Sequence, residues 1–282
     1  MSVENAEQIE EWNGALGQRW AEMQPEIDGI VVPFGEAALK AAAPQRGERV
    51  IDIGCGCGDT SMELARRVGE AGMVLGVDVS QPMLDIARSR KALERLANLA
   101  FSEADASEAE LPAATDLLFS RFGVMFFRQP SPAFGHLRQS LRAGGRCVFA
   151  CWRTPRDNAW AMTPLAAARK AMDITPAPAD PNAPGPFAFA DDERLRAILS
   201  SAGFGTVNVQ RFDAAVYLGA TPRAAAMNAL RIGPTSRFVR EVGTEHVPSV
   251  LDAVERSFTS LATPDGQVSL NGSAWIVTAS NS

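Results

Sequence analysis

The sequence has no long run of apolar residues and no excess of basic ones. No stretch approaches the roughly 18 consecutive apolar residues that a membrane-spanning helix needs, so no transmembrane segment is expected. Residues 1–7 are acidic and polar, which is unlike a signal peptide. There are 27 lysines and arginines against 33 aspartates and glutamates, a net charge of −6. This balance disfavours a sequence-independent grip on nucleic-acid phosphates.

Cysteine and histidine are scarce. The four cysteines form two pairs close in sequence, Cys55/Cys57 and Cys147/Cys151, and their sparse use favours a reduced, cytoplasmic setting. No metal site is expected, because neither a third cysteine nor a histidine lies near the C-x-C pair. His246 is one of only two imidazoles. It is a weak candidate for a general base, and no other catalytic residue is assigned.

Short apolar strands alternate with helical patterns through the first half of the chain. The chain has 282 residues, 46% of them hydrophobic, which suits a folded protein with a substantial core. The predicted strands here are residues 49–53, 73–78, 99–104, 115–120 and 146–152. Such alternation predicts an α/β fold, a doubly wound parallel sheet with helices on both faces.

The two ends of the chain have a different pattern. Residues 4–43 are helical, with Trp12, Leu16 and Trp20 repeating at intervals of four, and Trp12 is a candidate lid residue. Beyond Trp152 we expect helices at 154–172, 191–202 and 221–261, strands at 206–212 and 267–278, and a lid or loop at 175–186, which contains five prolines. We therefore divide the chain into an N-terminal helical lid (1–45), a core (46–153) and a helical cap with the last two strands (154–282).

The most informative segment is a glycine-rich turn between a strand and a helix. Gly54, Gly56 and Gly58 alternate directly after the strand at 49–53. Glycines at this place let the backbone turn sharply and approach a ligand, and the helix that follows offers free N–H groups. An anionic or carboxylate-bearing ligand should therefore bind there.

The spacing around this turn disfavours two nucleotide-binding alternatives. A dinucleotide fold uses G-x-G-x-x-G, but position 59 is aspartate, which would also repel a pyrophosphate. A phosphate-binding P-loop fails too, because no Gly-Lys-Ser/Thr follows. Asp52, just before the turn, suits a ligand that carries an ammonium group. An NAD-type oxidoreductase remains the first rival hypothesis.

At this point the sequence resembles the class I S-adenosylmethionine-dependent methyltransferases. Asp52 to Gly58 (DIGCGCG) is similar to the first motif of that family, with Cys57 where a small residue or threonine is commoner. Asp78 resembles the acidic residue that holds the ribose hydroxyls. Asp105-Ala106, after the third strand, resembles the pair that meets the adenine.

The resemblance extends from about residue 47 to residue 152. Leu141 to Arg146 (LRAGGR) is similar to the stretch before the fifth strand of the family, with Ala143 in place of proline. The N-terminal helices and Ser120 to Phe127 (SRFGVMFF) resemble a bacterial small-molecule branch related to quinone C-methylases. The resemblance implies a Rossmann-like, mostly parallel seven-stranded sheet with N-terminal helices and a helical cap.

The resemblance also implies the cofactor, S-adenosylmethionine, with S-adenosylhomocysteine as product. The predicted cofactor-binding residues are Trp12, Asp52, Gly54, Cys55, Gly56, Gly58, Thr60, Asp78, Val79, Met83, Asp105, Ala106, Ser120 and Arg121. The reaction implied is an in-line methyl transfer for which alignment in a dry cavity can suffice.

We expect the acceptor to be a small molecule with an apolar or aromatic part. Its pocket should lie between the Trp12/Trp20 helix, the Phe122–Phe127 segment and the cap from Trp160 to Phe189. Nucleic acid is not expected as a partner, and the sequence indicates neither the acceptor nor the oligomeric state. A non-catalytic protein that binds the same cofactor is the second rival hypothesis.

Overall fold

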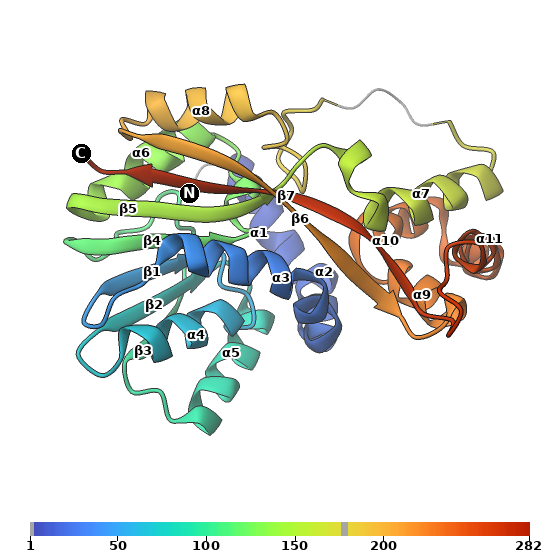
Figure 1. Cartoon of the computed structure of the whole chain (residues 1–282), viewed down its shortest axis with the longest axis horizontal. Helices are drawn as coiled ribbons and strands as arrows, with labels where there is room; N and C mark the ends of the chain where they lie inside the picture. Colours follow the sequence, from blue (N-terminus) through green and yellow to red (C-terminus); the bar gives the residue numbers. More distant parts are fainter. Residues whose placement is uncertain (1–2, 176–179) are drawn as a thin grey trace.

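The computed structural model of the chain describes residues 3–175 and 180–282. Seven strands form one sheet in the order β3-β2-β1-β4-β5-β7-β6 (Figure 1). The strands are β1 (Arg49–Ile53), β2 (Met73–Asp78), β3 (Leu99–Glu103), β4 (Thr115–Arg121), β5 (Leu141–Trp152), β6 (Val207–Gly219) and β7 (Val268–Ser280). The first five are parallel, and β7 runs antiparallel to both of its neighbours. The predicted mostly parallel, seven-stranded Rossmann-like sheet is confirmed.

The strand order reverses at β1, whose partners are β2 on one side and β4 on the other. The chain therefore leaves β1 and β4 in opposite directions, which opens a crevice at their carboxyl ends. Ligands of open α/β sheets bind at such a reversal point. The predicted glycine turn directly follows β1 and lies at this place.

Helices cover both faces of the sheet, and each face has its own apolar core. The core helices are α3 (Gln24–Ala42), α4 (Asp59–Val68), α5 (Gln81–Glu94), α6 (Pro130–Ser140) and α8 (Asp192–Ser201). Strand residues alternate between the two cores: Leu117 and Phe119 pack with α3 and α4, whereas Leu118 packs with α6 and α8. Cys147 and Cys151 are both buried on the α6 face, as their spacing of four predicts.

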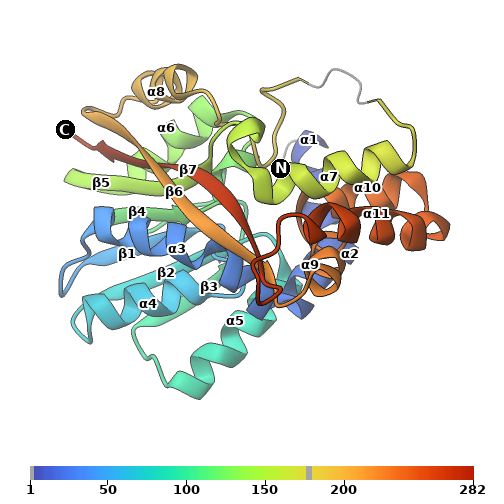
Figure 2. The ribbon, with the colours of Figure 1, turned by 45° about the vertical axis from the view of Figure 1, so that its right-hand side comes forward.

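A helical cap stands beyond the carboxyl ends of the parallel strands (Figures 1 and 2). It consists of α7 (Ala159–Ala171), α9 (Pro222–Ala229), α10 (Gly233–Val242) and α11 (Val247–Thr259), with short 3-10 turns at Pro155–Asp157 and Thr244–His246. A further 3-10 turn at Val124–Phe126 directly follows β4 and is not part of the cap. Strands β6 and β7 run on into the cap and stay paired from Val207 and Ala279 to Gly219 and Val268. The expected end of the sixth strand at residue 212 was wrong, because Val216 and Leu218 continue the alternation and are buried in the cap.

The N-terminal segment, which the sequence predicts to be helical over residues 4–43, forms the three helices α1, α2 and α3. Helices α1 (Val3–Asn13) and α2 (Ala15–Glu22) separate at Gly14, between Trp12 and Trp20. A Cβ at Gly17 would lie 1.8 Å from the carbonyl oxygen of Trp12. Only glycine therefore permits the tight packing of α2 on the end of α1.

Helix α6 ends at Ser140, because β5 already begins at Leu141. The side-chain amide of Asn281, beside the last strand, donates to the carbonyls of Leu141 and Arg142, which holds this stretch extended. Two of the five prolines in the expected lid, at 176 and 178, lie outside the described residues.

Phe34 joins the N-terminal helices to the sheet. Its ring is fully buried on α3. It meets Phe122, Trp152 and Phe212 edge-on, with ring centroids at 5.8, 4.8 and 5.7 Å. These rings come from three strands or strand ends, so one side chain fixes α3 over the middle of the sheet.

We expect Phe34→Ala to lower the free energy of unfolding by about 3–5 kcal/mol, because it empties a fully buried aromatic position. Denaturant unfolding measures the change. Val32→Ala is the matched control on the same helix, since Val32 is 43% exposed and should change stability by less than about 0.5 kcal/mol. A loss for Phe34→Ala no larger than that of the control would contradict this account of the core.

Candidate functional site

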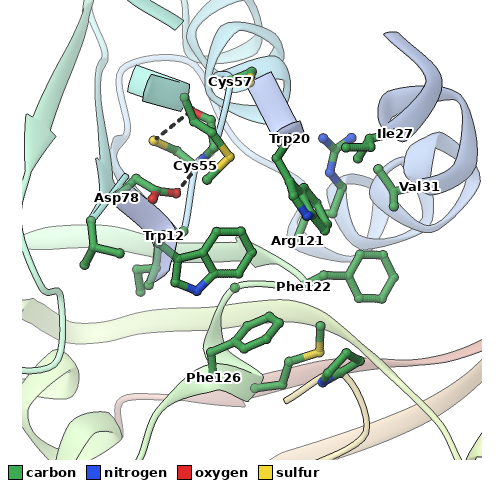
Figure 3. Close-up of a pocket in the computed structure, with 18 of the residues that line it drawn as sticks. Trp12, Trp20, Ile27, Val31, Cys55, Cys57, Asp78, Arg121, Phe122 and Phe126 are labelled. Carbon is green, nitrogen blue, oxygen red and sulfur yellow. Dashed lines mark hydrogen bonds between the residues drawn. The ribbon is translucent and has the colours of Figure 1, made fainter. Parts of the chain in front are cut away.

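One large cavity lies at the carboxyl ends of β1, β2 and β4 (Figure 3). The N-terminal helices, the segment after β4 and the cap enclose it, and its volume is about 220 Å³. Most of the predicted cofactor residues line it: Trp12, Gly54, Cys55, Gly56, Thr60, Asp78, Val79, Met83, Asp105, Ala106 and Arg121. Asp52, Gly58, Ser120 and His246 do not line it.

The three glycines of the turn have different surroundings, although all have positive φ. A Cβ at Gly54 would lie 2.8 Å from Cα of Gly123, so the loops after β1 and β4 touch here. A Cβ at Gly58 would lie 2.9 Å from the ring of Phe101, so Gly58 serves packing between helix and strand. Gly56 alone has open space, with no atom nearer than Sδ of Met83 at 3.9 Å. The space beside Gly56 is therefore available to a ligand.

The carboxylate of Asp78 connects two loops. Its oxygens accept from the amide of Gly56 at 2.7 Å and from the amide of Ser80 at 2.9 Å. Burial raises the pKa of Asp78, while the backbone N–H groups of Ser80, Gly56 and Val79 oppose that rise. A carboxylate has about four lone-pair positions, so Asp78 can still accept from a donor in the cavity. A hydroxyl group would suit it.

Asp52 lies behind the turn and not at the cavity surface. One carboxylate oxygen accepts from the hydroxyls of Thr60 at 2.7 Å and Ser61 at 2.6 Å, at the start of α4. The other oxygen, Oδ1, has no partner among the described residues. Burial raises the pKa of Asp52 from 3.8 to about 6, although the two hydroxyls and Arg121 act against it. Asp52 thus orients Thr60, which does line the cavity.

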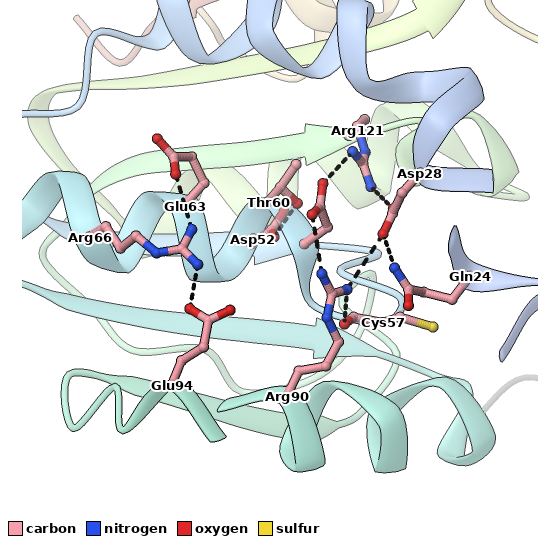
Figure 4. Close-up of polar contacts among 11 residues, drawn as sticks. Gln24, Asp28, Asp52, Cys57, Thr60, Glu63, Arg66, Arg90, Glu94 and Arg121 are labelled. Atoms are coloured by element: carbon pink, nitrogen blue, oxygen red, sulfur yellow. Dashed lines mark hydrogen bonds and ion pairs between the residues drawn. The ribbon is translucent and has the colours of Figure 1, made fainter. Parts of the chain in front are cut away.

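Two arginines and two aspartates form a network at the floor of the cavity (Figure 4). Arg121, at the end of β4, donates to Asp28 at 3.0 Å and to Asp59 at 2.8 Å. Arg90 of α5 reaches the same two carboxylates at 3.5 and 3.3 Å and donates to the carbonyl of Cys57 at 3.0 Å. The guanidinium groups of Arg121 and Arg90 therefore balance the charge of Asp59. Asp59 would repel a pyrophosphate less than the sequence suggests.

Asp28 is a site residue that the sequence reasoning missed. It lines the cavity from α3 and lies 93 positions from its partner Arg121. Nothing in the sequence near Asp28 distinguishes it from other polar helix residues. A pairing between such distant positions becomes visible only in the fold.

The end of α1 is tied to the loop after β2. The side-chain amide of Asn13 donates to the carbonyl of Val79 at 2.8 Å, and its oxygen accepts from the amide of Gln81 at 2.9 Å. The hydroxyl of Ser80 donates to the carbonyl of Trp12 at 2.7 Å. Trp12 then meets Trp20 and Phe126 edge-on, each at 5.5 Å. This anchoring places the Trp12 ring at the cavity beside the loop that Asp78 begins.

The other end of the cavity is apolar. Phe122 stacks on Trp152 at 4.1 Å, and Trp160 lies 5.1 Å from Trp152. Phe187 and Ile232 of the cap also line this end. The cavity lies between the N-terminal helices, the Phe122–Phe127 segment and the cap, as the sequence predicted.

Besides Asp52, three candidates lie away from the cavity surface. The hydroxyl of Ser120 donates to the carbonyl of Ile53 at 2.7 Å and accepts from the amide of Gly123 at 3.2 Å, so it joins the loops after β1 and β4. Gly58 is the packing position described above. His246 is 42% exposed in the cap, 3.9 Å from Glu245, and does not line the cavity. The role of His246 as a general base stays a prediction.

Two kinds of feature are missing from residues 3–175 and 180–282. No group of three or more histidine, cysteine, aspartate or glutamate side chains is placed to hold a metal ion. No helix in these ranges combines the length and the apolar character needed to cross a membrane.

Comparison with known proteins identifies the family. A methyltransferase-domain model matches residues 44–176. The demethylmenaquinone methyltransferase of Thermus thermophilus is 30% identical over 185 residues, which cover 62% of this chain and 83% of that protein. The chain belongs to the class I S-adenosylmethionine-dependent methyltransferases.

Other curated relatives match over shorter stretches. Aklanonic acid methyltransferase DauC of Streptomyces is 33% identical over 118 residues, 42% of this chain and 54% of that protein. The ubiquinone/menaquinone C-methyltransferase UbiE of Azotobacter vinelandii is 29% identical over 147 residues, 51% of this chain and 53% of that protein. The chain spans about half the length of these first curated relatives.

Solved structures share the fold at low sequence identity. The YcgJ protein of Bacillus subtilis has a TM-score of 0.57 and 17% identity over 87% of this chain and 97% of its own. The cyclase SpnF has a TM-score of 0.56 and 16% identity over 95% of both chains. Such similarity shows the fold alone.

The raised pKa of Asp52 predicts a pH-dependent stability difference between wild type and Asp52→Asn. A carboxyl group whose pKa is higher in the folded than in the unfolded chain lowers the free energy of unfolding as the pH rises. The loss develops between the pKa of the unfolded state and the pKa of the folded state. Between about pH 4 and about pH 7, wild type should therefore lose up to about 3 kcal/mol relative to Asp52→Asn.

Urea unfolding of both proteins at the two pH values measures this difference. The comparison removes the effect of all other titrating groups, because the two chains share them. A difference that stays constant with pH would mean that Asp52 titrates normally.

Proposed function

We propose that the chain binds S-adenosylmethionine at the carboxyl ends of β1 and β2 and transfers its methyl group to a small apolar acceptor. The observation that carries the proposal is the Asp78 carboxylate, held by two loop amides with lone pairs left toward the cavity. Family membership supports the same cofactor. The apolar end of the cavity supports an acceptor with apolar or aromatic parts.

The residues present suit each part of this cofactor. Asp78 would accept from the ribose hydroxyls. Asp105 and Ala106 with Met83 would meet the adenine. The open space beside Gly56 would admit the part of the ligand that lies against the loop backbone. The ring of Trp12 would lie over the methionine end. Asp52, whose Oδ1 has no partner among the described residues, would hold the start of α4 in place. The start of α4 would face the ammonium group of the methionine part.

The cofactor supplies an activated methyl group, and the chain supplies alignment and a dry cavity. The aromatic residues of the lid and cap keep water from the reacting atoms, which strengthens electrostatic effects there. The network of Arg121 and Asp28 fixes α3 against the glycine turn. Holding two reactants in line can account for roughly 7–11 kcal/mol of barrier reduction.

We propose the same three-part division of the chain that the sequence predicts. Residues 1–45 act as the lid, 46–153 bind the cofactor, and 154–282 form the cap and complete the sheet. Two of the relatives are named for aklanonic acid and for demethylmenaquinone, and acceptors of that kind, planar and largely apolar, would suit the aromatic end of the cavity.

The two rival hypotheses make different predictions. An NAD-type oxidoreductase would prefer nicotinamide nucleotides to S-adenosylhomocysteine. A non-catalytic binder would bind the cofactor and release no S-adenosylhomocysteine with any acceptor. The structural similarity to a cyclase shows that this fold also carries other chemistry.

Asp78→Asn should weaken the binding of S-adenosylhomocysteine about ten- to a hundredfold, because charge-assisted hydrogen bonds to the ribose are worth about 1.5–3 kcal/mol. Calorimetric titration measures the affinity. Asp85→Asn is the matched control, since Asp85 is 61% exposed on α5. Full affinity in Asp78→Asn, or no binding to wild type, would overturn the cofactor assignment.

A further inference from the structure

Strand β6 forms one edge of the sheet and is much longer than the strand at the other edge (Figures 1 and 2). It has 13 residues, whereas β3 has five. Its pairing with β7 runs without a bulge from Val207 to Tyr217. An edge strand presents a row of N–H and C=O groups that can pair with another chain, and proteins usually keep such edges short, bulged or covered. The outer edge of β6 is therefore a candidate interaction surface.

The hydrogen bonds at the start of β6 show which of its backbone groups point away from β7. The amide of Ser280 donates to the carbonyl of Thr206 at 3.2 Å, directly before the strand begins. Since bonded and non-bonded pairs alternate along antiparallel strands, the even-numbered residues of β6 bond to β7 and the odd-numbered residues face outward. The carbonyl of Val207 agrees with this, because it accepts from the guanidinium of Arg196 on α8 at 2.9 Å.

The outward backbone groups in the middle of β6 are unpaired. They belong to the odd-numbered residues Val209, Arg211, Asp213 and Ala215. The described residues offer these groups no hydrogen-bond partner, and the last three of the four residues are exposed. The unpaired stretch ends near Leu218, whose carbonyl accepts from the side-chain amide of Asn228 at 2.9 Å.

Two opposite charges lie on this edge, two residues apart. The guanidinium of Arg211 donates to the carboxylate of Asp213 at 2.7 Å, and both side chains lie on one face of the strand. The carboxylate also accepts from the hydroxyl of Ser273 on β7. The side chain of Arg211 is 60% exposed and that of Asp213 is 33% exposed. Both charges therefore remain accessible to a further partner of opposite sign.

This order of charges is self-complementary about a two-fold axis at Phe212. In an antiparallel pair of two β6 strands related by that axis, Arg211 of each copy faces Asp213 of the other, and Val209 faces Ala215. Odd-numbered residues then lie opposite each other, as the outward backbone groups require. Moving the axis by one residue would place two arginines or two aspartates opposite each other, which is unfavourable. The charges therefore favour the register centred on Phe212 over its neighbours.

We propose that the chain forms a two-fold dimer in which the β6 edges of two copies pair antiparallel and the two sheets become continuous. The partner of this edge is thus a second copy of the chain. The four charges alternate in sign around the axis, so each has one neighbour of opposite sign in its own chain and one in the other. Backbone hydrogen bonds supply the affinity, and the charges set the register.

The proposal is independent of the proposed function, because the cavity lies at the carboxyl ends of β1, β2 and β4. Analytical ultracentrifugation of the full-length protein tests it. At about 100 µM we expect a species of twice the 30.1 kDa chain mass, which dissociates on dilution. A protein that is monomeric at this concentration would overturn the proposal.

A proline variant tests whether the β6 backbone makes the contact. Ala215→Pro should raise the dissociation constant of the dimer at least about tenfold, because proline removes an N–H that points outward. The ladder between β6 and β7 does not use this N–H. Ala215→Ser keeps the N–H and should keep the dimer.

A charge variant gives a second test that does not depend on whether the proline is tolerated. Arg211→Glu changes only an exposed side chain and places carboxylates opposite carboxylates, so it should also raise the dissociation constant at least about tenfold. Arg211→Lys should keep the dimer. Arg237→Glu is the control for charge reversal elsewhere, since Arg237 is 78% exposed on α10 and paired with Glu241. A dimer that survives both Ala215→Pro and Arg211→Glu would form through another surface and would overturn the proposal.

A pair of cysteines tests the register. Gln210 of one copy and Ala214 of the other lie opposite each other in a non-bonded pair, where side chains are closest. Gln210→Cys/Ala214→Cys should therefore form a covalent dimer on oxidation. The wild type and each single variant are the controls and should stay free of cross-links. A dimer of the double variant that cannot be cross-linked would contradict the proposed pairing.

Discussion

The carboxylate of Asp78 accepts one hydrogen bond from the glycine turn and one from the loop after its own strand. These two contacts hold the loops after β1 and β2 at a fixed separation. The N-terminal helices depend on the same place, because Ser80 and Val79, next in sequence, bind the end of α1 through Trp12 and Asn13. One buried carboxylate thus positions both the glycine turn and the end of α1.

A second constraint comes from the opposite side of the reversal point. The loops after β1 and β4 approach so closely that Gly54 and Gly123 leave no room for a side chain. Ser120 joins them by hydrogen bonds, and Arg121 extends the connection to α3 through Asp28. The N-terminal helices are therefore held to the sheet at two points, and aromatic rings line the cavity beside them.

The sequence predicted well what depends on neighbouring residues. The glycine turn, the strand that ends in Asp78 and the alternation of the core strands all follow from local spacing, and the structure has them at the expected positions. It predicted the place of the cavity as well, because the reversal of strand order follows from the fold class.

What the sequence did not predict depends on contacts between distant residues. Gly58 has the same local pattern as Gly56, and only the ring of Phe101 shows that it serves packing. The pairing of Asp28 with Arg121, the exposed position of His246 and the length of β6 beyond residue 212 are decided by the cap and the N-terminal helices. The pattern of neighbouring residues predicts neither this pairing, nor this position, nor this strand length.

The central claim, that the cavity around Asp78 binds the cofactor under the lid, is tested most directly by hydrogen exchange with and without S-adenosylhomocysteine. The account predicts slower exchange at the amides of residues 54–58 and 78–83 and, in the same experiment, in α1, α2 and the first turn of α10. Exchange at α11 and on the far ends of the strands should stay unchanged. Unchanged exchange around Gly56 and Ser80, or protection confined to another part of the chain, would contradict it.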